Sequence, residues 1–185
     1  MELKGERLLA ADRATAWAAL NDTEMLKNCV PGCESITAIG ENEFEIVMTA
    51  AVGPVKARFK GKMALQDIDA PNAYTMKFDA SGGPTGFVRG EARVTLAEDS
   101  PTQTRLNYVA NAHIGGKLAQ VGSRLIDAAA GATADKFFEV FGALLAARAA
   151  PAAGAAAAAA QPAGPTKIGF FSLLLAFLKR LFGRA

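Results

Sequence analysis

Between Cys33 and His113, apolar and polar residues alternate with a period of two, and this pattern constrains the fold more than any other feature of the sequence. The clearest run is 55–65, in which apolar or small residues alternate with lysine and arginine. Turn-forming residues separate it from similar runs at 43–50, 74–78, 88–96 and 106–113. Successive side chains of a strand point to opposite faces, so the region is predicted to form an antiparallel meander with one solvated face.

Helical patterns flank this region on both sides. Before it, residues 2–10 are predicted to form one more strand, followed by short helices over 13–20 and 23–29. After it, a helical repeat of apolar residues runs from Lys117 to Arg148. The chain is therefore predicted to contain an α+β domain, in which a curved antiparallel sheet wraps around a long C-terminal helix.

The middle of the long helix consists of small residues, from Ala128 to Ala132. Small residues in a layer that packs on a curved sheet leave volume that larger side chains would fill, so this stretch indicates a cavity. The alternative is that small residues only allow helix and sheet to pack closely. The predicted ligand-binding walls are apolar and aromatic: Trp17, Leu26, Phe44, Met48, Phe59, Met76, Phe78, Phe87, Tyr108, Leu118, Val121 and Leu125.

The composition changes after the long helix. Residues 149–166 are rich in alanine and proline, which is typical of a flexible linker. Residues 167–185 are predicted to form an amphipathic helix, because the apolar stretch 168–178 is shorter than the ~20 residues that span a bilayer. The predicted membrane-binding side chains are Phe170, Phe171, Leu174, Phe177, Leu178, Lys179, Arg180, Leu181 and Phe182. The alternative is a helix that docks onto the domain or into a groove of a partner.

Charge and rare residues argue against several functions. A formal charge of +2 without a basic module argues against nucleic-acid binding. A structural zinc site needs four ligands, and Cys29, Cys33 and the single His113 are too few. Catalysis needs a nucleophile with a nearby base, and the sequence pattern indicates no such pair. The basic row at 56–62 is either solvated or a docking surface for an acidic partner. The charged N-terminus lacks the apolar run of a signal peptide, so the domain is expected in the cytoplasm.

Three segments carry a resemblance to a known family. They are Asn21-Asp22-Thr23-Glu24-Met25-Leu26, Cys29-Val30-Pro31-Gly32-Cys33-Glu34, and the run from His113 to Ile126 that reads HIGGKLAQVGSRLI. These segments resemble the signature segments of the family named for the G subunit of carbon monoxide dehydrogenase, and the likeness covers about residues 1–145. The resemblance implies the helix-grip fold of START-type, Bet v 1-like and polyketide cyclase-like proteins, with a ligand-binding domain over residues 1–148.

The resemblance also implies a partner and a location. Such proteins accompany molybdenum-containing carbon monoxide dehydrogenase, or a related molybdenum hydroxylase, and recruit it to the cytoplasmic face of the cell membrane. With a cavity and a membrane-binding helix, the chain is expected to be a non-catalytic peripheral protein that carries a respiratory quinone, menaquinone or ubiquinone. Tyr108 is a candidate hydrogen-bond donor to a quinone carbonyl, and the alternative is a core tyrosine whose hydroxyl bonds to the backbone. The alternatives are a tether without a ligand, and an enzyme that depends on Cys29, Cys33 or His113.

Overall fold

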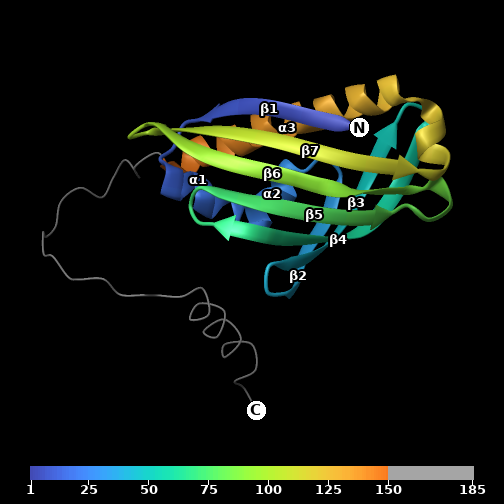
Figure 1. Ribbon diagram of the computed structural model, residues 1–185, viewed down its shortest axis with the longest axis horizontal. Helices are drawn as coiled ribbons and strands as arrows, with labels where there is room; N and C mark the ends of the chain where they lie inside the picture. Colours follow the sequence, from blue (N-terminus) through green and yellow to red (C-terminus); the bar gives the residue numbers. More distant parts are fainter. Residues whose placement is uncertain (150–185) are drawn as a thin grey trace, which may run out of the picture. The chain divides into compact units, whose positions relative to one another are not determined.

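Figure 1 shows the computed structural model, which describes residues 1–149. Its elements, in chain order, are β1 (Glu2–Leu9), α1 (Arg13–Leu20), α2 (Thr23–Cys29), β2 (Cys33–Gly40), β3 (Glu43–Val52), β4 (Val55–Asp69), β5 (Ala73–Ser81), η1 (Gly83–Thr85), β6 (Phe87–Ser100), β7 (Gln103–Gly115), η2 (Gly116–Val121) and α3 (Ser123–Ala149). The predicted linker over 149–166 and the amphipathic helix over 167–185 lie outside the described residues, apart from Ala149, which ends α3.

All seven strands form one antiparallel sheet in the order β1-β7-β6-β5-β4-β3-β2. From β2 to β7 each strand pairs with its neighbour in sequence, as a meander does, and β1 is added beside β7. The sheet is curved and unclosed, with β1 and β2 at its two edges. In the view of Figure 1, α3 passes behind β1 and β7, while α1 and α2 lie at the end of the sheet where α3 finishes.

Aspartates begin both short helices. The Asp12 carboxylate accepts a hydrogen bond from the backbone N–H of Thr15 at 3.0 Å, and Asp22 accepts one from Met25 N–H at 3.1 Å. Each bond satisfies an N–H group that has no partner within the helix. Arg148 also donates to Asp22 at 2.9 Å, so the last turn of α3 is joined to the residue that caps α2.

The predicted helix over 117–148 is wrong at its start. Residues 116–121 form the 3₁₀ helix η2, and α3 begins only at Ser123. Between them Gly122 has a φ of 93°, a backbone conformation that L side chains rarely adopt and that no α-helix contains. The predicted α+β class, the antiparallel meander and the two short helices are confirmed.

The fully buried core lies where α1, α2 and the C-terminal half of α3 meet the sheet. Phe141 and Leu145 of α3 are completely buried there, together with Leu106 of β7. The hydroxyl of Thr104, also fully buried, donates to the carbonyl oxygen of Ala11 at 2.8 Å. This end of the domain is closed by packed side chains, so any unfilled interior lies further along the sheet.

Candidate ligand-binding interior

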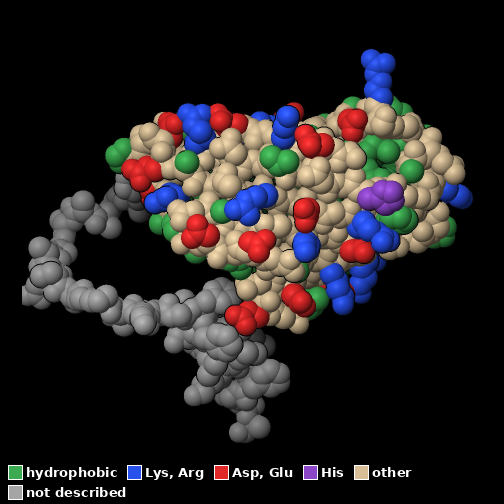
Figure 2. Space-filling view, in the orientation of Figure 1, with side chains coloured by type: hydrophobic (Ala, Val, Ile, Leu, Met, Phe, Trp, Pro, Cys, Tyr) green, Lys and Arg blue, Asp and Glu red, His purple; other side chains and the backbone are tan. Residues whose placement is uncertain are grey.

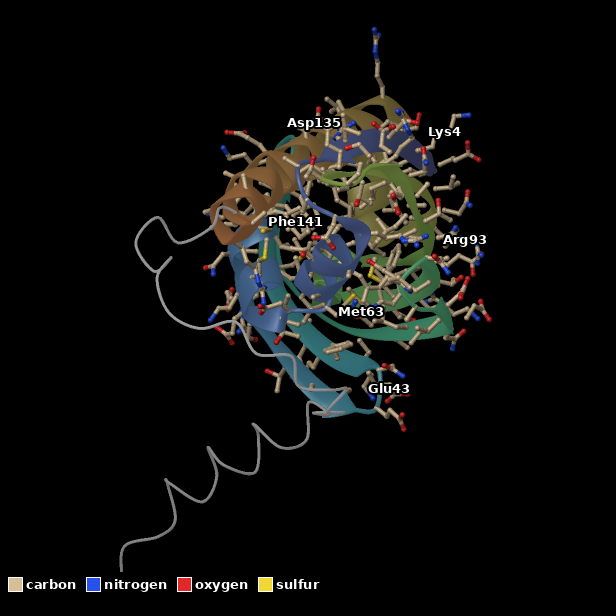
Figure 3. All side chains as sticks on the ribbon, turned by 90° about the vertical axis from the view of Figure 1, so that its left-hand side faces the viewer. Lys4, Glu43, Met63, Arg93, Asp135 and Phe141 are labelled. Carbon is tan, nitrogen blue, oxygen red and sulfur yellow. The ribbon has the colours of Figure 1, made fainter. Side chains whose placement is uncertain are left out.

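Strand pairing defines which side chains face the interior. One row across β3 to β7 consists of Phe44, Met63, Phe78, Gly90 and Ala112. Neighbouring rows on the same face contain Met48, Phe59 and Met76. In Figure 3, Met63 and Phe141 point into the space that sheet and helices enclose, whereas Lys4 and Arg93 point outwards. Five of the predicted wall residues, those of β3, β4 and β5, thus share the inner face.

Aromatic contacts join the sheet to the helices near the closed end. Trp17 of α1 meets Tyr74 of β5 edge-to-face, with ring centroids 5.7 Å apart. Tyr108 of β7 stacks on Phe138 of α3 at 5.4 Å. Leu26 of α2 packs against the same core. Trp17, Leu26 and Tyr108 therefore lie inside the domain, at the boundary between its packed end and its remaining interior.

Beyond this boundary, inward-facing apolar residues are only half-buried. Phe59 is an exception, because it is buried against Gly82, where an added Cβ would lie 2.8 Å from the Phe59 ring. The half-buried set, which we call the open apolar surface, comprises Phe44, Met48, Met63, Phe78, Val88 and Ile114. Side chains on the inner face of a sheet are normally buried by the opposite layer, so this part of the interior is incompletely filled by the described residues.

Small residues face this region from α3. An inward stripe with helical spacing consists of Ile126, Ala130, Ala134, Phe137, Phe141 and Leu145. Ile126, Phe141 and Leu145 are buried, whereas Ala130 and Ala134 between them are only partly so. At the adjacent Gly131, an added Cβ would meet no atom of another element within 4 Å. The small stretch of α3 therefore leaves space beside it.

The sheet is also made of small residues at the same level. Four residues of helix advance about 6 Å and two residues of strand about 6.8 Å. Phe138 of α3 and Tyr108 of β7 are stacked, so they mark the same level along the sheet. Towards the C-terminal end of β7, Ala134 then lies at about the level of Ala110, and Ala130 at about that of Ala112. These β7 residues pair with Ala92 and Gly90 of β6. Alanine and glycine side chains are too short to reach across the ~10 Å that separates packed layers.

Three predicted wall residues lie around the turn into α3. Leu118 of η2 is buried and Val121 is half-buried. Leu125 is 48% exposed, and its Cδ1 would be 3.5 Å from a Cβ added to Gly53 in the β3–β4 turn. Leu125 thus lies beside the β3–β4 hairpin, at the end of the interior opposite α1.

The prediction that Phe87 lines the interior is wrong. Phe87 precedes the inward-facing Val88, so its side chain lies on the outer face of β6. There the Arg89 guanidinium lies 4.4 Å from the Phe87 ring centroid, and the His113 ring is 5.7 Å away. Hydrophobicity alone favours an inward phenylalanine, but strand parity decides its face.

Sequence reasoning missed an inward-facing arginine. Arg7 of β1 is paired with Leu106, so it points inwards, where it forms an ion pair with Asp135 of α3 and lies 5.3 Å from the Phe138 ring centroid. It therefore clamps the edge strand β1 to α3. The alternation Leu3-Gly5-Arg7-Leu9 carried this signal, since Arg7 shares the parity of two apolar residues.

Burial favours the neutral forms of two cysteines and one tyrosine within residues 1–149. Burial raises the pKa of both the Cys29 and Cys33 thiols, and it raises the pKa of Tyr74 to about 12. These groups are held in their neutral forms, whereas a reactive thiol needs a lowered pKa. His113 lies on the outer face. Within residues 1–149, no three histidine, cysteine or acidic side chains converge on a metal-binding point.

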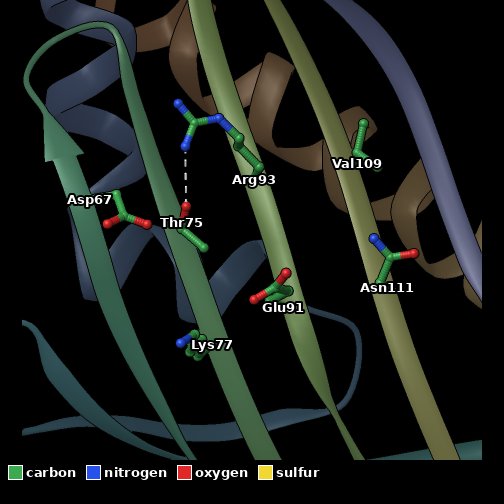
Figure 4. A pocket seen from close by; sticks show the side chains of 7 residues that line it. All are labelled: Asp67, Thr75, Lys77, Glu91, Arg93, Val109 and Asn111. Atoms are coloured by element: carbon green, nitrogen blue, oxygen red, sulfur yellow. Dashed lines mark hydrogen bonds between the residues drawn. The ribbon is translucent and has the colours of Figure 1, made fainter.

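The outer face of the sheet carries interspersed charges of both signs, as Figure 2 shows. In the basic row at 56–62, Arg58 pairs with Glu34 at 2.8 Å and Lys60 with Glu45 at 3.0 Å. The row is therefore partly neutralised. Further along this face, β4 to β7 surround a pocket of about 330 Å³, whose floor contains the buried Thr75 (Figure 4).

The curved sheet, the C-terminal helix and their partly filled interior define a protein of the helix-grip class. Solved structures with this fold include a START superfamily protein from Mycobacterium smegmatis (11% identity, 80% of this chain and 98% of that chain covered, TM-score 0.62). Another is the Zhui aromatase/cyclase from Streptomyces sp. R1128 (12% identity, 83% and 98% covered, TM-score 0.63). A conserved protein from Geobacillus kaustophilus is more similar (28% identity, 80% and 96% covered, TM-score 0.75).

The family follows from the sequence match over most of the domain. The model of CoxG, the G subunit of carbon monoxide dehydrogenase, matches residues 5–145, and the chain belongs to this family. A comparison with curated proteins returns no match. Among the helices of residues 1–149, none combines the length and hydropathy that crossing a membrane requires.

Proposed function

We propose that this chain is a non-catalytic accessory protein of molybdenum-containing carbon monoxide dehydrogenase, or of a related molybdenum hydroxylase, that binds a respiratory quinone. The quinone, menaquinone or ubiquinone, occupies the interior between α3 and the sheet. Residues 167–185 attach the chain peripherally to the cytoplasmic face of the cell membrane, and the domain couples the dehydrogenase to the membrane electron-transport chain. The family match supports the partner, and the interior supports a lipophilic ligand.

The opposed small residues of α3 and the sheet carry this proposal. Ala130 and Ala134 of α3 lie at about the level of Ala112 and Ala110 of β7, and the residues of the open apolar surface on the inner face of the sheet are only half-buried. An apolar ligand covers such a surface at a gain of about 25 cal/mol per Å² removed from water. A tether without a ligand gains nothing from leaving this surface uncovered, which favours the carrier over the bare tether.

Tyr108 supports a ligand with a carbonyl group. Its ring stacks on Phe138, and its hydroxyl oxygen would lie 2.6 Å from a Cβ added to Gly5. Glycine at position 5 thus leaves room for the hydroxyl. Among the hydrogen bonds that join residues 1–149, none involves this hydroxyl, so its proton is free for a ligand acceptor such as a quinone carbonyl oxygen.

The distribution of charge supports membrane attachment through the tail alone. All 18 acidic residues lie within residues 1–149, whereas residues 150–185 contain four of the 20 basic residues and no acidic one. Each basic residue near an anionic leaflet contributes about 1 kcal/mol of attraction. The domain itself carries slightly more acidic than basic residues, so attraction to such a surface is concentrated in the tail.

Organic extraction and mass spectrometry of the full chain, purified from a respiring host, test the ligand. We expect a stoichiometric quinone in the wild type, its loss in Ala130→Phe and its retention in Ala132→Phe, because Ala132 is exposed on the opposite side of α3. Absence of quinone from the wild type would refute the proposal. If Ala130→Phe stops electron delivery while the dehydrogenase still binds, the bare tether is excluded.

Deleting residues 150–185 tests the attachment separately. The shortened chain is expected to stay in the supernatant when anionic vesicles are sedimented, while the full chain sediments with them. Sedimentation of the shortened chain would show that the domain holds the membrane by itself.

A further inference from the structure

The outer-face pocket is built by two cross-strand rows. Thr75, Arg93 and Val109 stand side by side on β5, β6 and β7 in one row, and Lys77, Glu91 and Asn111 form the next. Thr75 and Val109 are short, whereas the side chains around them are long. The pocket is therefore a hollow with a low floor and charged walls, as Figure 4 shows. Its volume of about 330 Å³ is at the small end of the range for small-molecule sites, about 300–1,000 Å³.

The backbone of β4 directs a carboxylate to this hollow. The pairing of β4 with β5 is interrupted between Gln66 and Asp69, and within this bulge Asp67 has a φ of 49°. Bulges reorient side chains at the point where they occur. In Figure 4, the Asp67 carboxylate points towards Thr75. Asp67 thus adds a fourth charged group to the wall of the pocket.

The four charged side chains, two basic and two acidic, form no ion pair with one another. Lys77 lies directly opposite Glu91, and Arg93 is on the same side of the sheet as Asp67. Among the ion pairs of residues 1–149, none joins any two of these four groups. Arg93 donates only to the Thr75 hydroxyl, at 3.3 Å, which is longer than a usual hydrogen bond. These donors and acceptors are therefore available to an occupant.

The geometry points to a binding site for a small zwitterion, a molecule that carries both an ammonium and a carboxylate group, as amino acids do. A carboxylate can accept from Lys77 and Arg93, and an ammonium group can donate to Asp67 and Glu91. Simple anions meet the two carboxylates of the pocket and simple cations meet its two basic groups, so the pocket selects against both. Thr75, which is 8% exposed, adds a hydroxyl donor on the floor.

This site is independent of the quinone proposal, because it lies on the opposite face of the sheet. Inward-facing Met76 and Ala92 are the sequence neighbours of Thr75, Lys77, Glu91 and Arg93, so the same strands serve the interior and the pocket with alternate residues.

Isothermal titration calorimetry of the full chain tests the site. The probes are glycine, β-alanine and γ-aminobutyrate, whose ammonium and carboxylate groups are progressively further apart, with acetate and ethylammonium as probes of one charge only. We expect saturable binding of at least one zwitterion and none of either single-charge probe at the same concentrations. Absence of binding by all three zwitterions, or equal binding of acetate or ethylammonium, would overturn the proposal.

Matched variants locate the binding. Lys77→Met and Glu91→Gln each remove one charge from the pocket, and each is expected to weaken zwitterion binding about tenfold or more, since hydrogen bonds to charged groups contribute about 1.5–3 kcal/mol. Lys62→Met is the control, because Lys62 lies opposite Asp79 as Lys77 lies opposite Glu91, but outside the pocket. Unchanged binding in both pocket variants, or equal weakening in Lys62→Met, would assign the binding elsewhere. Circular dichroism of each variant separates loss of the site from loss of the fold.

Discussion

Replacing Ala130 by phenylalanine reports whether the interior contains unfilled space. If it does, the new ring enters the gap between α3 and the sheet, and its burial stabilises the fold by about 1.5–3 kcal/mol. If the gap is already filled, overpacking destabilises the fold by about 1–3 kcal/mol. Phenylalanine also has a lower helix propensity than alanine, at a cost below about 0.7 kcal/mol. Ala132→Phe measures that cost alone, because Ala132 is exposed on the same helix.

Because both variants share the same helix-propensity cost, we expect Ala130→Phe to exceed Ala132→Phe in free energy of unfolding by the burial gain of about 1.5–3 kcal/mol. Urea titration followed by the fluorescence of Trp17, the single tryptophan, measures both values. The chains must first be stripped of bound lipid, since a ligand stabilises the wild type by mass action. An Ala130→Phe variant of equal or lower stability than Ala132→Phe would refute the inference that the small residues enclose space.

Other predictions concern contacts that hold the domain together. Thr104→Val should destabilise the fold by about 1–3 kcal/mol in urea titration, because it leaves the carbonyl of Ala11 without its buried hydrogen bond; a neutral effect would contradict this role. Arg7→Ala should cost about 1–2 kcal/mol and Asp135→Ala less than about 0.5 kcal/mol, because Arg7 also covers an aromatic ring whereas the ion pair is exposed; equal costs would show that the ion pair alone matters. A hydrogen bond from Arg58 lowers the pKa of Glu34. The contribution of ionised Glu34 to stability is therefore present at neutral pH and is lost as the pH falls through that lowered pKa. Glu34→Gln should therefore weaken the acid dependence of the melting temperature, and an unchanged acid profile would contradict this assignment.

Much of the fold followed from periodicity. The period of two in apolar and polar residues predicted the strands of the meander. Proline and glycine marked the end of the helix over 23–29. The start of α3 did not follow, because a helical repeat of apolar residues continues through 117–121. Only the positive φ of Gly122 in the folded chain shows that the repeat is broken there.

The interior was predicted in part. Phe44, Met48, Phe59, Met76 and Phe78 share the inner face because parity within a strand is a local property. The prediction for Phe87 is wrong because it follows hydrophobicity, whereas parity within β6 places this side chain on the outer face.

The sequence by itself determined the strands, the class of the fold and the family, because these depend on local periodicity and on short segments of fixed order. Tertiary structure alone decided how far the interior is filled, since that depends on the distance between layers that are remote in sequence. It also brought Asp67, Lys77 and Arg93 to one pocket, because the sheet sets residues of separate strands at fixed register across about 5 Å.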